Sequence, residues 1–190
     1  FENVEPAGDS LAYVIYAADK IATAAERGRE ESGKLEFTPL KSIFNTLNEN
    51  NQNKVYNPEI ISKNSTINYP VENCTEDIAD KLDNIKQDLQ KKIGTIVYER
   101  EYLNYLLETF EIYLSHFPSS YLNEERADIS LYDHIKITTA ISSCIYQYLE
   151  EKGIKDYKSE LINSKEEFEN KNIFLLQSMD LSGIQQFIYK

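Results

Sequence analysis

Residues 130–153, SLYDHIKITTAISSCIYQYLEEKG, indicate the fold class. Ser130, followed three residues later by Asp133, resembles a capping box, in which side chains satisfy the free N–H groups at a helix start. Apolar residues then recur at helical spacing, and Gly153 is a residue type that commonly ends helices. The stretch therefore predicts a long helix, whose expected buried stripe comprises Ile137, Ile141, Cys144, Ile145 and Tyr148.

The same periodicity predicts helices that precede this stretch. Residues 11–27 carry apolar side chains at helical spacing, with Asp9 or Ser10 as the N-cap and Gly28 as the stop. Residues 78–93 form one apolar stripe, and residues 102–117 form a broad apolar face that Pro118 ends. We expect these last two helices to pair.

Two other regions lack this long-range helical pattern. Residues 29–72 are interrupted by prolines and asparagines, which predicts an irregular connection with room for short strands. After residue 153, a polar, acidic helix at 158–169 leads into an apolar run at 173–179, which predicts a strand buried on both faces. The expected fold class is mainly α with a few short strands, divided at 1–30, 31–75, 76–127 and 128–190.

Composition limits the classes of function. The 190 residues carry a formal net charge of -12, the wrong sign for a surface that grips nucleic acid over many phosphates. Cys74 and Cys144 lie far apart and outside any metal or redox spacing, so reduced structural thiols are expected. The sequence has neither a membrane-length apolar run nor a signal peptide, which predicts a cytoplasmic protein without membrane contact. The start at Phe1, without an initiator methionine, indicates a fragment.

Asp19 and His134 are the candidate polar residues on apolar helix faces. Asp19 lies four residues after Ile15 and eight after Leu11, a costly place for a carboxylate unless it is paired or binds a metal. Spacing alone favours a paired or edge position over a metal ligand. His134 lies three residues before Ile137, so we expect a hydrogen-bonded core residue rather than a catalytic one.

The stretch 180–186, DLSGIQQ, has the features of a ligand-binding turn. The predicted strand ends in the Asp180 carboxylate, and a turn of small residues opens the next helix, whose free N–H groups attract phosphate. Gly183 permits close approach to the backbone, and Asp180 or Ser182 can hold a metal or a hydroxyl group. An ordinary strand-to-helix connection is the alternative.

Several motifs resemble one known family. The segments ADISLYDH at 127–134, IYQYL at 145–149 and FLLQSMDLSGIQQFIY at 174–189 resemble the large subunit of the type III-A CRISPR RNA-guided effector complex. The first two lead into the family's first palm domain, and the third looks like its first strand and helix. The segment LAYVIYAADKIA at 11–22 is similar to a late helix of the family's N-terminal HD nuclease domain.

The resemblance implies the tail of an HD-type helical domain followed by the first βα unit of a truncated ferredoxin-like palm. It implies a parent protein that cleaves single-stranded DNA with Mn²⁺ or Mg²⁺ and makes cyclic oligoadenylate from ATP. Asp19 would lie near the metals, and Asp180, Ser182, Gly183 and Gln185 would lie beside ATP. Gln186 stands where the family usually has Asp. The implied partners are other complex subunits, CRISPR RNA, target RNA and single-stranded DNA.

Several expectations remain open at this point. The isolated chain should be inactive and bind no cofactor tightly, because the family's His-Asp pair and second palm are missing from it. One alternative function is a non-enzymatic, acidic helical module that binds a protein partner. Another is a small metal phosphohydrolase unrelated to CRISPR.

Overall fold

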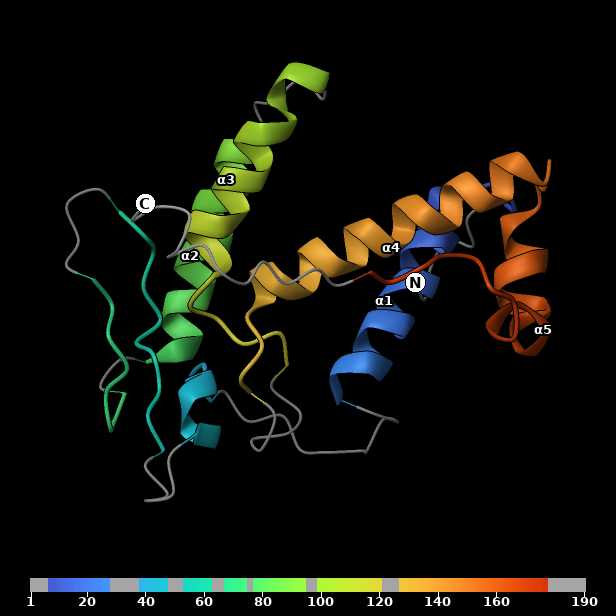
Figure 1. Ribbon diagram of the computed structural model, residues 1–190. Helices are drawn as coiled ribbons and strands as arrows, with labels where there is room; N and C mark the ends of the chain where they lie inside the picture. The colour runs from blue at the N-terminus through green and yellow to red at the C-terminus, as the bar shows by residue number, and fades with distance from the viewer. Residues whose placement is uncertain are drawn as a thin grey trace, which may run out of the picture. The chain divides into compact units, whose positions relative to one another are not determined.

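The computed structural model describes residues 7–27, 38–47, 53–62, 67–74, 77–94, 99–120 and 127–177. In these residues the chain is mainly helical, as predicted. The α-helices are α1 (Leu11–Arg27), α2 (Ile78–Ile93), α3 (Leu103–Leu114), α4 (Leu131–Glu151) and α5 (Lys165–Glu169) (Figure 1). Shorter helical segments are the 3-10 helices η1 (Ile43–Leu47) and η2 (Arg100–Tyr102) and the π-helix η4 (Ser159–Asn163).

The chain divides into two compact units. One unit combines Phe1–Ala17 with Ser142–Lys190, and the other is Ala18–Ile141. Both α1 and α4 cross the division, so each helix contributes one part to each unit.

The core of the unit Ala18–Ile141 forms where α2 and α3 pack side by side, which confirms the predicted pair (Figure 1). Ile85 of α2 and Tyr113 of α3 are buried there, together with Leu114 and Phe117. Helix α3 ends at Leu114 rather than at residue 117, where the following Pro118 disfavours helical backbone. The partly buried neighbours of this core are Ile60, Leu82, Leu89, Phe110, Leu131, Tyr132 and Ile135.

The described parts of the predicted connector contain isolated antiparallel bridges. Val55 pairs with both Lys41 and Val71, and the two Val55–Val71 backbone hydrogen bonds are both 2.8 Å long. The Asn45 side chain donates to the Lys54 carbonyl and accepts from the Lys54 N–H, at 2.8 and 3.0 Å. The irregular connection is therefore held by a few specific hydrogen bonds.

In the other unit, the second half of α4 provides much of the buried surface. Ile145 and Leu149 are fully buried, and the Tyr148 ring meets the Phe168 ring edge-on at 6.5 Å between centroids. Gly153 lies just after the end of α4 and has a φ of 68°, a backbone conformation that favours glycine. The predicted polar helix at 158–169 is present as η4 and α5, which are separated at Ser164.

Two predictions are wrong, one about the buried face of α4 and one about a strand. Ile137 was placed on the buried stripe of α4 but is 50% exposed, and the fully buried Leu149 was not on that stripe. Residues 173–177 form no strand, and Leu175 and Leu176 are 87% and 88% exposed. A strand buried on both faces needs neighbouring strands to satisfy its backbone groups. In the described ranges, no strand pairs with residues 173–177.

Candidate functional site

Asp19 lies at the edge of the buried face of α1. Val14, Ala18 and Ala22 form that face, whereas Leu11 and Ile15 are more than half exposed. Asp19 follows the exposed pair at helical spacing, and its side chain is 48% exposed. The edge position that helix geometry favoured is confirmed, and the carboxylate remains accessible to solvent.

His134 lies in the first turn of α4, where the predicted capping box is present. The Asp133 N–H donates to Ser130 Oγ at 3.0 Å, and the Ser130 hydroxyl donates to Asp133 Oδ2 at 2.7 Å. The Leu131 N–H also donates to the Phe117 carbonyl at 2.7 Å. These bonds fix the start of α4 next to the end of α3, and His134 is 8% exposed there.

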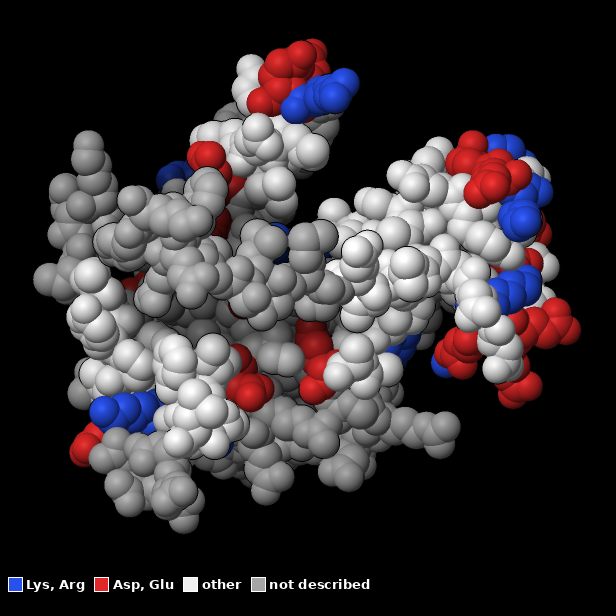
Figure 2. Space-filling model, viewed as in Figure 1, with Lys and Arg blue, Asp and Glu red and all other residues white. Residues whose placement is uncertain are grey.

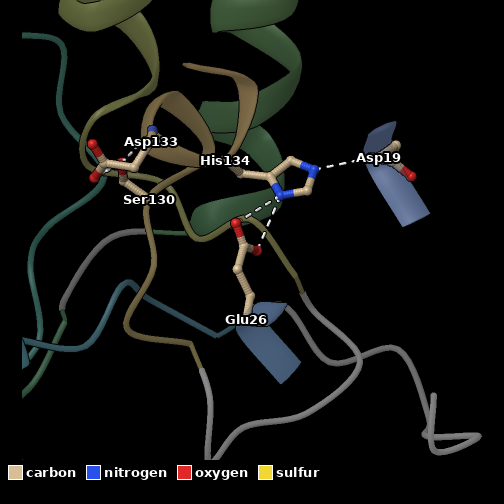
Figure 3. Close-up of polar contacts among 5 residues, drawn as sticks. All are labelled: Asp19, Glu26, Ser130, Asp133 and His134. Atoms are coloured by element: carbon tan, nitrogen blue, oxygen red, sulfur yellow. Dashed lines mark hydrogen bonds and ion pairs between the residues drawn. The ribbon is translucent and has the colours of Figure 1, made fainter. Parts of the chain in front are cut away.

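The His134 ring lies between two carboxylates of α1 (Figure 3). Its Nε2 is 3.0 Å from Asp19 Oδ1, and its Nδ1 is 3.0 Å from both Glu26 oxygens. Asp19 and Glu26 are seven residues apart, so they share one helix face and are separated by about 10 Å along the axis. The ring fills the space between them. We call these residues the Asp19–His134–Glu26 cluster.

The two carboxylates of the cluster differ in burial. The Glu26 side chain is 10% exposed and the Asp19 side chain is 48% exposed, so solvent reaches the cluster from the Asp19 side.

The cluster is not a metal site by itself. Its two carboxylates bind opposite edges of the ring, so the three side chains do not converge on one point. No group of three or more His, Cys, Asp or Glu side chains in the described part of the chain is arranged to hold a metal ion. As a metal ligand, Asp19 offers one oxygen, Oδ2, since its hydrogen bond to His134 within the described part of the chain uses Oδ1.

The other predicted site residues have different outcomes. Asp180, Ser182, Gly183 and Gln185 lie outside the described residues, as does Gln186. Cys74 and Cys144 are reduced thiols, as predicted.

Both histidines have structural contacts. His134 is a hydrogen-bonded core residue, as expected. His116 Nδ1 contacts the Glu59 carbonyl at 2.9 Å, and its ring stacks on Tyr56 with 5.7 Å between centroids.

Sequence reasoning missed Glu26. The available signal was its spacing of seven residues from Asp19, which places both carboxylates on one face of α1. That spacing does not identify the partner, because His134 is 108 residues away from Glu26 in the sequence.

Charges of both signs alternate over the end of α4 and over α5 (Figure 2). Lys155 Nζ lies 2.7 Å from Glu150 Oε1, Lys165 Nζ lies 3.5 Å from Glu169 Oε1, and Lys171 pairs with Glu160. The hydrogen bonds from Lys155 and Tyr157 lower the pKa of Glu150. The acidic run at 150–169 is thus a solvated, ion-paired surface. Among the described residues, no helix is long and apolar enough to cross a membrane.

Comparison with known proteins places the chain among CRISPR-system proteins. No protein-family profile matches it. It is 35% identical over 192 residues to the CRISPR system single-strand-specific deoxyribonuclease Cas10/Csm1 (subtype III-A) of Mycobacterium tuberculosis, covering 99% of this chain and 24% of that protein. The proteins of the same name from Enterococcus italicus and Streptococcus thermophilus are 35% and 34% identical. Each match covers 95% of this chain, and 26% and 25% of those proteins respectively.

The chain belongs to the Cas10/Csm1 family of subtype III-A CRISPR systems. It spans about a quarter of the length of the curated relatives that it matches. The family resemblance predicted from the motifs is therefore confirmed.

Proposed function

We propose that this chain is part of a subtype III-A CRISPR effector subunit that cleaves single-stranded DNA in antiviral defence. The observation that carries the proposal is the 35% identity over 99% of the chain to a protein named for that activity. Such a match favours this function over an acidic interaction module or an unrelated phosphohydrolase, the two alternatives that composition left open.

Asp19 is the residue of the described chain that we assign to the nuclease centre. Its carboxylate is half exposed, and one of its oxygens accepts a hydrogen bond from His134 at 3.0 Å. Carboxylate oxygens suit Mn²⁺ and Mg²⁺. When bound, such an ion activates water and polarises a phosphate oxygen. Asp19 would supply one ligand, and further ligands would come from parts of the full-length protein that this chain does not span.

A second activity, cyclic oligoadenylate synthesis from ATP, is proposed for the palm of the full-length protein. The motif at 174–189 resembles the first strand and helix of the palm. In this proposal Asp180, Ser182, Gly183 and Gln185 lie beside one ATP, with phosphate attracted by the free N–H groups of the helix start.

The proposed setting is a cytoplasmic ribonucleoprotein complex. The partners are other type III-A subunits, CRISPR RNA, target RNA and single-stranded DNA. The net charge of -12 favours nucleic-acid contacts made by other parts of the full-length protein and by its partners. The division at 1–30, 31–75, 76–127 and 128–190, with an HD-type tail first and the palm start last, belongs to the same proposal.

Two substitutions in the full-length protein test the assignments separately. Asp19→Asn should reduce Mn²⁺-dependent cleavage of labelled single-stranded DNA by about 100-fold or more, because the amide removes the ligand charge. Asp180→Asn should reduce oligoadenylate formation from ATP and leave DNA cleavage unchanged. Asp80→Asn, at an exposed site in α2, is the matched control. Full cleavage by the Asp19→Asn protein would exclude Asp19 from the nuclease centre.

A further inference from the structure

A groove lies between the connector and α2. Residues 58–60 form one wall, and one stripe of α2 forms the other wall, which consists of Lys81, Asn84, Ile85 and Asp88. The segment that contains residues 58–60 runs beside α2 (Figure 1). The groove has a volume of about 430 Å³ and is open to solvent. The proposed function assigns no role to it.

The backbone of residues 59–61 is paired on one side. The Glu59 carbonyl accepts from His116 Nδ1 at 2.9 Å. The Ile61 N–H donates to the Ile112 carbonyl at 3.0 Å. Residues 59 and 61 thus direct their peptide groups towards the end of α3. Successive residues of an extended chain direct these groups to opposite sides, so those of Ile60 point away from α3.

The peptide groups of Ile60 have no partner. Within the described residues, neither its N–H nor its C=O makes a hydrogen bond, and the Pro58 carbonyl makes none either. Asn57 Oδ1, one residue earlier, is buried and also lacks a partner. Buried backbone groups are normally paired, because an unsatisfied donor or acceptor is costly. The segment 57–60 therefore has unused hydrogen-bonding groups beside the groove.

We propose that this groove binds an extended peptide segment of another subunit of the effector complex, which adds as a strand along Ile60. The source of the peptide rests on the proposed function. In this mode of recognition, the peptide backbone pairs with the free N–H and C=O of Ile60, and alternate side chains of the peptide face α2.

The walls of the groove determine which side chains the peptide carries. Ile85 is 5% exposed and lines the groove together with Pro58, so an apolar side chain fits between them. The charged residues of the walls are Glu59, Lys81 and Asp88. Two carboxylates against one ammonium group favour a peptide with a Lys or Arg next to its apolar residue. The same excess of carboxylates disfavours nucleic acid as the ligand.

Blocking the groove in the full-length protein tests the proposal. Asn84 is an exposed residue of the α2 wall, so Asn84→Trp fills the groove without removing a core side chain. Gln90→Trp is the matched control, because Gln90 is an exposed amide of α2 outside the groove. Biolayer interferometry gives the dissociation constant between each protein and the remaining type III-A subunits, assembled on CRISPR RNA.

We expect Asn84→Trp to weaken this binding by about 10-fold or more, because the peptide can no longer enter the groove. Gln90→Trp should leave the dissociation constant unchanged, and both variants should have the melting temperature of the unsubstituted protein. Equal dissociation constants for the Asn84→Trp protein and the unsubstituted protein would overturn the proposal.

Hydrogen exchange at the Ile60 amide tests the addition of a strand directly. Mass spectrometry with fragmentation of peptides from residues 57–62 measures it in the isolated full-length protein and in the complex. Exchange at Ile60 should slow by about 10-fold or more in the complex, and Asn84→Trp should remove this protection. The Ile61 amide, which is bonded to Ile112, should exchange slowly in both states and is the internal control.

Two results of the exchange experiment would contradict the proposal. Equal exchange at Ile60 in both states would show that no strand pairs with it. Slow exchange already in the isolated protein would show that another part of the same protein occupies the groove.

The binding measurement also separates this inference from the proposed function. If the unsubstituted protein does not bind the type III-A subunits, the proposed function fails and the inference fails with it. If it binds them, and Asn84→Trp binds equally well while Ile60 stays unprotected, only the assignment of the groove is wrong.

Discussion

At the residue scale, the placement of each charged side chain follows from the partners within its reach. Asp19 lies at the edge of an apolar helix face and is paired with His134. Glu150, near the end of α4, accepts from Lys155 at 2.7 Å and from the Tyr157 hydroxyl at 3.1 Å. Each carboxylate gains a donor that compensates for its lost hydration.

The Glu150 contacts predict a pH dependence. The hydrogen bonds from Lys155 and Tyr157 lower the pKa of Glu150 below its ordinary value of 4.5. Because the folded-state pKa lies below the unfolded one, the contribution to stability is present above the unfolded pKa and is lost as pH falls through the folded pKa. Lys155→Ala should raise the pKa of Glu150, as measured by NMR titration of its carboxyl carbon.

Lys165→Ala is the control for this titration, because Lys165 pairs with Glu169 in α5 and is not a partner of Glu150. An unchanged Glu150 titration in the Lys155→Ala protein would show that the contact does not persist in solution.

At the element scale, the caps decide where α2 and α4 begin. Asp77 Oδ1 accepts from the N–H groups of Ala79 and Asp80 at the start of α2, at 2.9 and 3.3 Å. Ser130 and Asp133 form the capping box of α4. Both caps satisfy N–H groups that the first turn of a helix leaves without partners.

Ser130→Ala should destabilise the chain by about 1 kcal/mol, because it removes the cap of α4. Urea denaturation followed by circular dichroism gives the free energy of unfolding. Ser164 precedes α5 without a side-chain cap hydrogen bond, so Ser164→Ala should change stability by less than about 0.5 kcal/mol. Equal effects of the two substitutions would contradict the assignment of the cap.

At the scale of the whole molecule, stability and activity have different sources. The α2–α3 core is built by this chain alone, with Phe117 fully buried. In the proposed function, both activities also draw on parts of the full-length protein that this chain does not span, since it covers 24% of the Mycobacterium tuberculosis relative. The chain should therefore fold but lack catalytic activity.

Phe117→Ala should destabilise the core by about 3–5 kcal/mol, since it removes a large buried side chain and leaves a cavity. Phe44, on η1, is 61% exposed. Phe44→Ala is therefore the matched control, with an expected loss below about 1 kcal/mol in the same urea experiment. A small effect at Phe117 would contradict its place in the core.

The chain of residues 1–190 should not turn over either proposed substrate. We expect no cleavage of single-stranded DNA with Mn²⁺ and no product from ATP with Mg²⁺, because the resemblance implies that cleavage needs a His-Asp pair, and synthesis a second palm, that residues 1–190 do not contain. Gel electrophoresis and chromatography of the products test this, with the full-length protein as the positive control. Turnover of either substrate by the chain would contradict the prediction.

The sequence by itself determined where the longer helices lie and the ends of several of them, because helical periodicity and caps are local. Residues 11–27 and 78–93 form helices with the predicted bounds, and the capping box at Ser130 is present. The family was also readable from the motifs at 127–134 and 174–189.

Only the tertiary structure decided which sides of those helices are buried and which charges meet. Ile137 was predicted to be buried but is half exposed, because burial depends on what packs against a helix as well as on its own pattern. Residues 173–177 form no strand, because a strand buried on both faces needs neighbouring strands on each side, and none of the described residues pairs with this segment. Glu26 and His134 meet across 108 residues, a contact that only the packing of α1 near the start of α4 brings about.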